Sequence, residues 1–337
     1  MGDNTLWLIN KACKGKTHIK LTIGTLDADG KQTIKVFGEN GEVQNENYIY
    51  EIGSITKTFT ASLLAKYIHE QKMSLDDRVS KYVDSLDSEK YFPILKRLAT
   101  HTAGYPTYLP FSKWEYAQLI FRQLFEGKKQ GDFPFQMDLE RMKQLALETT
   151  RQDKEDYPWQ YSNFGMALLG YAIGVASGMG YWNTMNDFLS KELGLKHSYT
   201  GTIADKNLHG FNRKNKDIGN WVWGNDFTAP AGDISSTAED LLKYARINLY
   251  DEKPYLALCH QKYLAAKRCD MGLGWVMDKK NNNVLWHNGG TGAFRSYLAI
   301  DKENKLAAVA LVNYPIFMDR VGSAVLENLQ KKRSIIH

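Results

Sequence analysis

Ser54 and Lys57 stand three residues apart where a helix is expected to begin, because the stretch from Thr56 to about Glu70 lacks proline and glycine. Its apolar side chains recur every four positions, at Ile55, Phe59, Leu63 and Tyr67. Residues three apart on a helix share one side, so the lysine amine can take the serine proton once burial lowers its pKa. The free N–H groups of a helix start also favour a developing oxyanion. The pair indicates a nucleophilic serine; the alternative is that Ser54 only caps the helix.

A tyrosine and an asparagine two residues apart, Tyr161 and Asn163, precede an almost wholly apolar segment from Phe164 to Ser177, which predicts a buried helix. If both side chains enter one cleft, the phenol could relay a proton and the amide could bind a substrate carbonyl. The alternative is that Tyr161 packs at the mouth of the helix while Asn163 caps it.

A glycine-rich segment follows His287 near the end of the chain. Glycine occupies three of the four positions from 289 to 292, which allows a ligand to lie against the backbone. The imidazole of His287 can act there as an electrostatic or proton-transfer partner, with an ordinary pKa of about 6.5. The alternative is a glycine-rich turn whose histidine packs or faces solvent.

Strand patterns occur at both ends of the chain. Alternating apolar residues from His18 to Phe37 turn at Asp29-Gly30 and predict a hairpin. Later strands are expected at 274–277, 284–287, 295–301 and 306–313, with a final helix at 319–331. Between the two ends, helices are expected at 75–79, 94–100, 114–127, 138–149 and 164–177.

These elements predict an α/β (α+β) fold, in which an antiparallel sheet flanked by helices is built from both chain termini. One domain would contain residues 1–72 and 200–337, with Ser54 and the glycine-rich third motif. Residues 73–199 would form an inserted all-helical domain that carries Tyr161 and Asn163.

Composition excludes several classes of protein. The 337 residues carry a net charge of +5 with the charges scattered, which gives no sign of a nucleic-acid partner. The longest apolar run, 166–176, is too short to cross a bilayer. Of the three cysteines, Cys259 and Cys269 could pair, while Cys13 stands apart and no disulfide framework is indicated. Their spacing around His260 does not fit a zinc site, and we expect neither a metal nor a cofactor.

Other hydrolase classes lack their motifs here. An α/β-hydrolase needs Gly-x-Ser-x-Gly, but Gly53 directly precedes Ser54, and no His-Glu-x-x-His metalloprotease motif is present. A different class of function is a binding module that has lost turnover. The four candidate polar residues of the first two motifs argue against that loss, because a scaffold has no chemical need for all of them.

Taken in chain order, the Ser-x-x-Lys, Tyr-x-Asn and His-x-Gly patterns described above resemble the three motifs of the penicillin-recognising serine hydrolases. The most similar branch contains class C β-lactamases, D-alanyl-D-alanine carboxypeptidases, D-aminopeptidases and related esterases. Residues 98–104 and 229–240 also resemble segments of this family, so the likeness extends from about Leu21 to Leu329.

The resemblance implies a catalytic role for each candidate residue. Ser54 matches the acylated nucleophile, Lys57 the lysine that activates it, and Tyr161 the proton relay of this branch. Asn163 matches the amide that binds the substrate acylamide. His287 stands where the lactamases have a lysine.

The resemblance also implies binding roles for the backbone. An oxyanion hole would be formed by the N–H groups of Ser54 and Gly290, with Gly289 in the same substrate-binding strand. Arg320 could supply a contact to a substrate carboxylate.

A serine hydrolase that forms an acyl-enzyme on Ser54 is therefore implied, as in a D-Ala-D-Ala carboxypeptidase or another D-amino-acid peptidase that acts on peptidoglycan. The alternatives are a class C-like β-lactamase or small-ester esterase, and a penicillin-binding sensor without turnover. His287 for lysine and Asn288 for threonine weaken the lactamase alternative, because that lysine–threonine pair helps to hold the β-lactam carboxylate.

The expected partner is a small molecule or peptide, namely a D-amino-acid peptide, a β-lactam or an ester, with no nucleic acid and no strong membrane signal. Family members of this kind usually act outside the cytoplasm on cell-wall material, in the periplasm, the envelope or the medium. The chain opens with the polar stretch Met1–Asn4 and shows no signal peptide, so a cytoplasmic location is also open.

Overall fold

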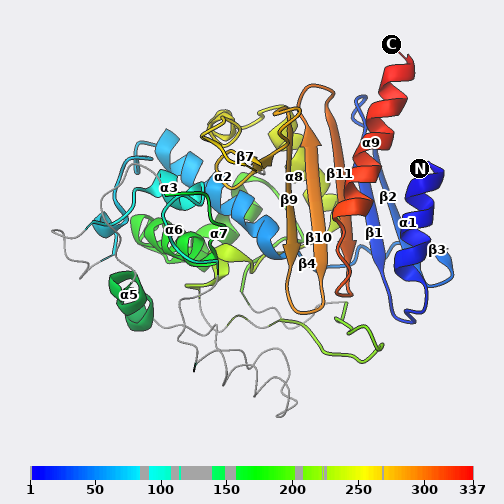
Figure 1. Ribbon diagram of the computed structural model, residues 1–337, viewed down its shortest axis with the longest axis horizontal. Helices are drawn as coiled ribbons and strands as arrows, with labels where there is room; N and C mark the ends of the chain where they lie inside the picture. The colour runs from blue at the N-terminus through cyan, green and yellow to red at the C-terminus, as the bar shows by residue number, and fades with distance from the viewer. Residues whose placement is uncertain are drawn as a thin grey trace.

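An antiparallel sheet occupies the centre of the molecule (Figure 1). The computed structural model describes residues 2–83, 91–107, 114, 139–148, 157–201, 208–221, 223, 226–267 and 269–336. Within these residues the sheet has nine strands in the order β3-β2-β1-β11-β10-β9-β8-β7-β6. They are β1 (Leu21–Leu26), β2 (Gln32–Gly38), β3 (Gly41–Val43), β6 (Leu264–Ala265), β7 (Asp270–Met271), β8 (Val276–Met277), β9 (Val284–Gly290), β10 (Arg295–Asp301) and β11 (Leu306–Val312). Strands β4 (Tyr50–Glu51) and β5 (Ser235–Ser236) form a separate short pair.

The two ends of the chain meet in the middle of this sheet, where β1 lies between β2 and β11. Leu21 stands opposite Val312 in the antiparallel β1–β11 pair. Strand β11 is buried along its whole length, as expected for a central strand with both faces covered. Its alternate side chains enter two hydrophobic clusters, one on each face of the sheet.

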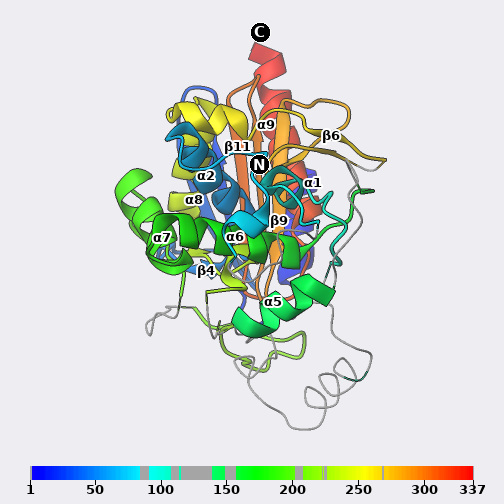
Figure 2. The same ribbon diagram turned by 90° about the vertical axis from the view of Figure 1, so that its left-hand side faces the viewer.

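Helices cover both faces (Figure 1). Helices α1 (Asp3–Cys13) and α9 (Asp319–Ile336) pack together on one face, and α8 (Ala238–Leu249) covers the other, beside α2 (Thr56–His69). The remaining helices are α3 (Leu95–Ala99), α5 (Leu139–Glu148), α6 (Asn163–Ser177) and α7 (Tyr181–Asp187). Figure 2 shows α6 and α7 below α2, with α5 below them. The short helical turns are η1 (Gly53–Ile55), η2 (Val79–Lys81), η4 (Phe188–Glu192), η5 (Ala229–Ala231) and η6 (Pro254–Leu258).

The predicted fold class is confirmed: an antiparallel sheet from both chain ends is flanked by helices. The hairpin, the later strands and the helices predicted at 94–100, 138–149, 164–177 and 319–331 all match elements of the structure within a few residues. The helix predicted at 114–127 lies outside the described residues except for Trp114. The division into two domains at residues 73 and 199 stays a prediction.

One predicted helix is wrong, and three helices have no counterpart among the predictions. Residues 75–76 form a turn, Arg78 makes a β-bridge with Ile94, and the short helical turn η2 begins only at Val79. The carboxylate of Asp77 favours the turn by accepting a hydrogen bond from the backbone N–H of Ser74 (2.8 Å). Helices α1, α7 and α8 match no pattern described above. For α8 a signal was available, since the hydroxyl of Thr237 caps the helix by accepting from the N–H of Asp240 (3.2 Å).

Within the described residues no single helix is long and apolar enough to cross a membrane. Helix α6 together with the segment Tyr181–Glu192 passes by length and composition, but the two are bent by 78°. Cys13, Cys259 and Cys269 are free thiols, so the alternative in which the last two pair is wrong.

Candidate active site

Ser54 and Lys57 face each other at the start of α2. Ser54 lies in the turn η1, which leads directly into the helix. The Nζ atom of Lys57 lies 3.0 Å from the Oγ atom of Ser54 and 2.5 Å from the carbonyl oxygen of Ala231. The Lys57 side chain is completely buried, and burial lowers its pKa well below the usual value. A lysine of lowered pKa can be neutral near physiological pH and can then accept the Ser54 proton.

The loop before α6 brings Tyr161 to the same point. The Nζ atom of Lys57 lies 4.9 Å from the centre of the Tyr161 ring. The ring of His287, on β9, lies 6.2 Å from the Tyr161 ring, measured between centroids. Three candidate residues from distant parts of the chain therefore surround one place.

Asn163 is the first residue of α6. The cap of this helix is Ser162, whose hydroxyl accepts a hydrogen bond from the N–H of Gly165 (2.9 Å). The interpretation of Asn163 as the cap is therefore wrong. Its side chain is half-buried, and its contact with a substrate stays a prediction.

His287 is buried and lies close to the carbonyl oxygen of Asn288, 2.6 Å from its Nδ1 atom. Burial, and to a smaller extent the neighbouring Lys57, lower the pKa of His287 to about 3. The imidazole is therefore neutral at physiological pH, with Nδ1–H donating to the carbonyl. This neutral state departs from the ordinary pKa assumed from the sequence, because the histidine is a buried residue of β9 and does not lie in a solvated turn.

The glycine end of β9 lies against the turn that carries Ser54. A β-carbon on Gly289 would collide with the carbonyl group of Ile52, and the hydroxyl of Ser296 donates to that same carbonyl (2.7 Å). Strand β8 pairs with β9 only opposite residues 285 and 286. Among the described residues, the stretch 287–290 thus has a strand neighbour on one side alone, and its other edge can accept an extended ligand.

Glu51 is a buried residue of the site that the motif search missed. Its carboxylate accepts hydrogen bonds from the hydroxyl of Thr291 (2.5 Å) and the backbone N–H of Trp221 (2.7 Å). It therefore ties the glycine-rich turn to the loop around Trp221. The available signal was a single charge inside the apolar run 48–52.

Trp223 adds an aromatic wall that no motif spacing indicates. Its ring lies 3.3 Å from the point where a β-carbon on Gly232 would stand. That point is 3.7 Å from the carbonyl carbon of Gly53, the residue before Ser54. An aromatic surface therefore lies near the backbone next to Ser54.

Arg320 does not lie with these residues. It is exposed in the first turn of α9 and lines a hollow with Trp286 and Tyr297, which belong to the sheet face opposite Lys57. Asn288 also faces that side, where its amide donates to the carboxylate of Asp319 (2.7 Å). The expected contact between Arg320 and a substrate at Ser54 has no support in this geometry.

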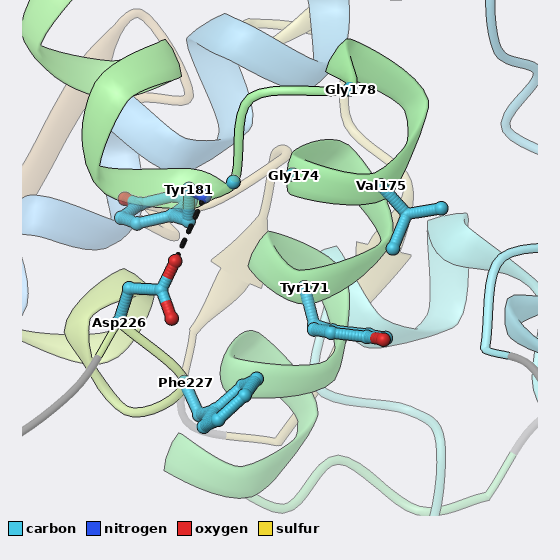
Figure 3. A pocket seen from close by; sticks show the side chains of 8 residues that line it. Tyr171, Gly174, Val175, Gly178, Tyr181, Asp226 and Phe227 are labelled. Atoms are coloured by element: carbon cyan, nitrogen blue, oxygen red, sulfur yellow. Dashed lines mark hydrogen bonds between the residues drawn. The ribbon is translucent and has the colours of Figure 1, made fainter.

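A hollow of about 360 Å³ lies where α6 turns into α7 (Figure 3). At its edge the carboxylate of Asp226 accepts a hydrogen bond from the N–H of Tyr181 (3.1 Å). The Tyr181 hydroxyl lies 2.7 Å from that of Thr60, which donates to the carbonyl of Pro230 (3.0 Å). These contacts hold Pro230 in place. The carbonyl oxygen of the next residue, Ala231, accepts the hydrogen bond from Lys57.

The fold is that of solved β-lactamases and of a penicillin-binding protein homologue, and the cluster of serine, lysine and tyrosine offers a nucleophile beside a base. The chain belongs to the Beta-lactamase family, whose sequence model matches residues 14–329. The family predicted from the three motifs is confirmed.

Individual relatives carry different names. A protein named Beta-lactamase from Pseudomonas fluorescens is 27% identical over 265 residues, a match that covers 75% of this chain and 64%, just under two thirds, of that protein. The D-alanyl-D-alanine-carboxypeptidase/endopeptidase AmpH of Escherichia coli K12 is 25% identical over 317 residues, which cover 84% of this chain and 77% of AmpH. The solved structure of a β-lactamase/D-alanine carboxypeptidase from Pseudomonas syringae has a TM-score of 0.78 at 18% identity and covers 97% of each chain, which shows a shared fold.

Proposed function

We propose that this chain is a D-amino-acid peptidase of the D-Ala-D-Ala carboxypeptidase type, acting through an acyl-enzyme on Ser54. The observation that carries the proposal is the 3.0 Å approach of the buried Lys57 amine to the Ser54 hydroxyl. A surface lysine would be protonated and hydrated, and would be a poor base. Lys57 is completely buried, and no carboxylate among the described residues pairs with its Nζ atom, which favours the neutral amine that the reaction requires.

Acylation begins when Lys57, assisted by Tyr161, takes the proton from Ser54. The serine oxygen then forms a bond to the substrate carbonyl carbon, and the carbonyl oxygen becomes an oxyanion. The backbone N–H groups of Ser54 and Gly290 bind that oxyanion. When the tetrahedral intermediate collapses, the bond to the leaving amine breaks, and Tyr161 gives the amine its proton.

Deacylation reverses the proton path. A water molecule loses a proton to Tyr161 and attacks the acyl carbon, and the oxygen of Ser54 leaves with a proton from Lys57. The same oxyanion donors serve both steps. The edge of β9 at Gly289 and the amide of Asn163 would hold the acyl-side backbone of the substrate throughout.

The third motif weighs against a β-lactamase, because His287 and Asn288 stand where the lactamases have lysine and threonine. His287 is neutral and supplies no cation to a substrate carboxylate, and Asn288 donates to Asp319 on the opposite face of the sheet. A peptide that ends in D-alanine also carries a carboxylate. The support for a peptidase is therefore the similarity to AmpH, which is named for D-alanyl-D-alanine carboxypeptidase activity, and not the charge at this motif.

A small ester is the second candidate substrate. The neutral imidazole of His287 and the aromatic ring of Trp223 provide an uncharged surface for an apolar acyl group. By family resemblance we also propose that the protein works outside the cytoplasm, where peptides that end in D-alanine occur.

The test measures intact-protein mass after mixing with benzylpenicillin, at short and long times, for wild type and Ser54→Ala. In parallel, release of D-alanine from a tripeptide that ends in D-Ala-D-Ala is measured. We expect a lasting adduct and D-alanine release for wild type alone. Consumption of the drug through a transient adduct would favour a β-lactamase, and an adduct with no turnover of any substrate would favour a sensor. Full activity of Ser54→Ala would overturn the proposed mechanism.

A further inference from the structure

His101 is a buried histidine next to the candidate catalytic residues, and the mechanism above does not use it. Its ring lies 4.7 Å from the ring of Tyr161 and 6.5 Å from that of Trp159, measured between centroids. The imidazole therefore packs against the phenol that is proposed to carry the proton, on the loop that leads into α6.

Three hydrogen bonds join the His101 segment to the loop of Tyr161. The Nδ1 atom of His101 accepts from the backbone N–H of Ser162 (3.2 Å), and its carbonyl oxygen accepts from the N–H of Gln160 (2.9 Å). The carbonyl of Thr102 accepts from the N–H of Tyr157 (3.1 Å). His101 alone thus holds the residue before Tyr161 and the residue after it.

The hydrogen bond from Ser162 also defines the state of the imidazole. A nitrogen that accepts cannot carry a proton, so the proton of neutral His101 is on Nε2. Burial lowers the pKa of His101 well below its usual value, and Lys57 and His287 lower it further. A protonated ring would lose the acceptor at Nδ1, so the neutral state is the one that holds the loop.

Two features of His101 are unfavourable for stability. Its backbone has φ +60°, a left-handed conformation that is uncommon outside glycine, although asparagine, aspartate and histidine adopt it more often than other residues. Its Nε2 atom is buried without a hydrogen-bond partner among the described residues. Both are the kind of strain that persists where function requires it.

We infer that His101 is a positioning residue for Tyr161: its imidazole and its carbonyl clamp the backbone on both sides of the tyrosine and fix the phenol beside Lys57. This inference rests on the proposed function, because Tyr161 must act in proton transfer for its position to matter. His101 itself touches neither the serine nor the substrate in this account.

The test compares His101→Asn with His101→Gly. Both residues tolerate φ +60°, but only asparagine places an acceptor oxygen where Nδ1 stands. We expect His101→Gly to lower kcat by about 30- to 100-fold with KM changed by less than about threefold, as displacement of a catalytic group does. His101→Asn should recover kcat to within about fivefold of wild type.

A double-mutant cycle with Tyr161→Phe then shows whether His101 acts through the tyrosine. In the Tyr161→Phe background, His101→Gly should cost less than about threefold in kcat. An equal loss in both backgrounds, or an asparagine variant as slow as the glycine variant, overturns the inference. If Tyr161→Phe alone turns over substrate normally, Tyr161 has no catalytic role and the inference is overturned. Failure of the proposed function itself is distinguished by a different result, namely activity of the Ser54→Ala variant.

Thermal melts of every variant identify loss of folding. If His101→Gly does not fold, His101→Asn is compared with His101→Gln, whose longer amide reaches the position of Nε2 instead of Nδ1. The asparagine variant should then have the higher kcat by about tenfold. Equal rates for these two variants would overturn the inference.

Discussion

The backbone of Gly53 lies so close to that of Gly290 that no side chain fits between them. A β-carbon on Gly53 would stand 2.8 Å from the carbonyl carbon of Gly290, and Gly53 has φ +52°. The two proposed oxyanion donors, the N–H groups of Ser54 and Gly290, depend on this approach.

Gly53→Ala should therefore lower kcat/KM by more than about 100-fold, because it pushes one oxyanion donor away from the other. Gly30→Ala is the matched control: Gly30 also has positive φ (+80°), but its β-carbon would meet nothing within 4 Å. We expect the control to lose only about 1 kcal/mol of stability and no activity. Steady-state kinetics and denaturant melts measure both, and equal activity of the two variants would contradict the proposed role of this contact.

Lys57→Met removes the proposed base while keeping an unbranched side chain of similar length. Turnover should fall by about 1,000-fold or more, whereas the free energy of unfolding should fall by no more than about 1 kcal/mol, because a buried amine no longer has to be desolvated. Lys66→Met, on the exposed side of the same helix, should leave turnover unchanged. A loss of stability that accounts for the whole loss of activity would argue against a catalytic function for Lys57.

The burial of His287 makes acid destabilise the protein. The pKa of His287 is about 3 in the folded state and about 6.5 in the unfolded state. Above pH 6.5 both states are neutral and stability is complete; as pH falls from 6.5 towards 3, only the unfolded state binds the proton. This histidine alone should therefore lower the free energy of unfolding by up to about 1.4 kcal/mol per pH unit in that window.

Denaturant unfolding of wild type and His287→Gln at pH 7, 6 and 5 measures this effect. The variant should lose less stability between pH 7 and 5 than wild type. The slope of its free energy of unfolding against pH should be smaller by the amount that corresponds to about one bound proton. His101, which is buried and neutral as well, contributes the same trend in both proteins. Identical slopes would show that His287 is protonated as easily in the folded as in the unfolded state.

Glu51→Ala leaves the hydroxyl of Thr291 and the N–H of Trp221 without this acceptor. We expect a loss of about 2 to 3 kcal/mol in stability and about a tenfold fall in kcat, because the turn after Gly290 is no longer held. Glu51→Gln, which keeps one acceptor oxygen, should lose less of both. Glu42→Ala on the exposed strand β3 should change stability by less than about 0.5 kcal/mol, and an equal effect of the two alanine substitutions would contradict the bridging role of Glu51.

Local patterns were sufficient to predict most of the fold. Alternation and the Asp29-Gly30 turn predict the first hairpin, and helical periodicity after Ser54 predicts α2. The chemical motifs were likewise readable, because serine, lysine and tyrosine occur at spacings that a known mechanism requires.

The remaining site residues depend on contacts between distant segments. Glu51 meets a threonine 240 positions later, and Lys57 meets a carbonyl 174 positions later. The pKa of His287 depends on burial by other elements, which its own neighbours in sequence do not reveal. Arg320 was assigned from the family resemblance, and the packing of α9 places it on the other face of the sheet.

The pairing of β1 with β11 has a consequence for biosynthesis. Ser54 and Lys57 leave the ribosome long before the glycine end of β9 and before β11, the strand that completes the middle of the sheet. Until those residues emerge, the nascent chain holds the proposed serine and base without the proposed second oxyanion donor. A chain that stops before β9 is therefore expected to be inactive.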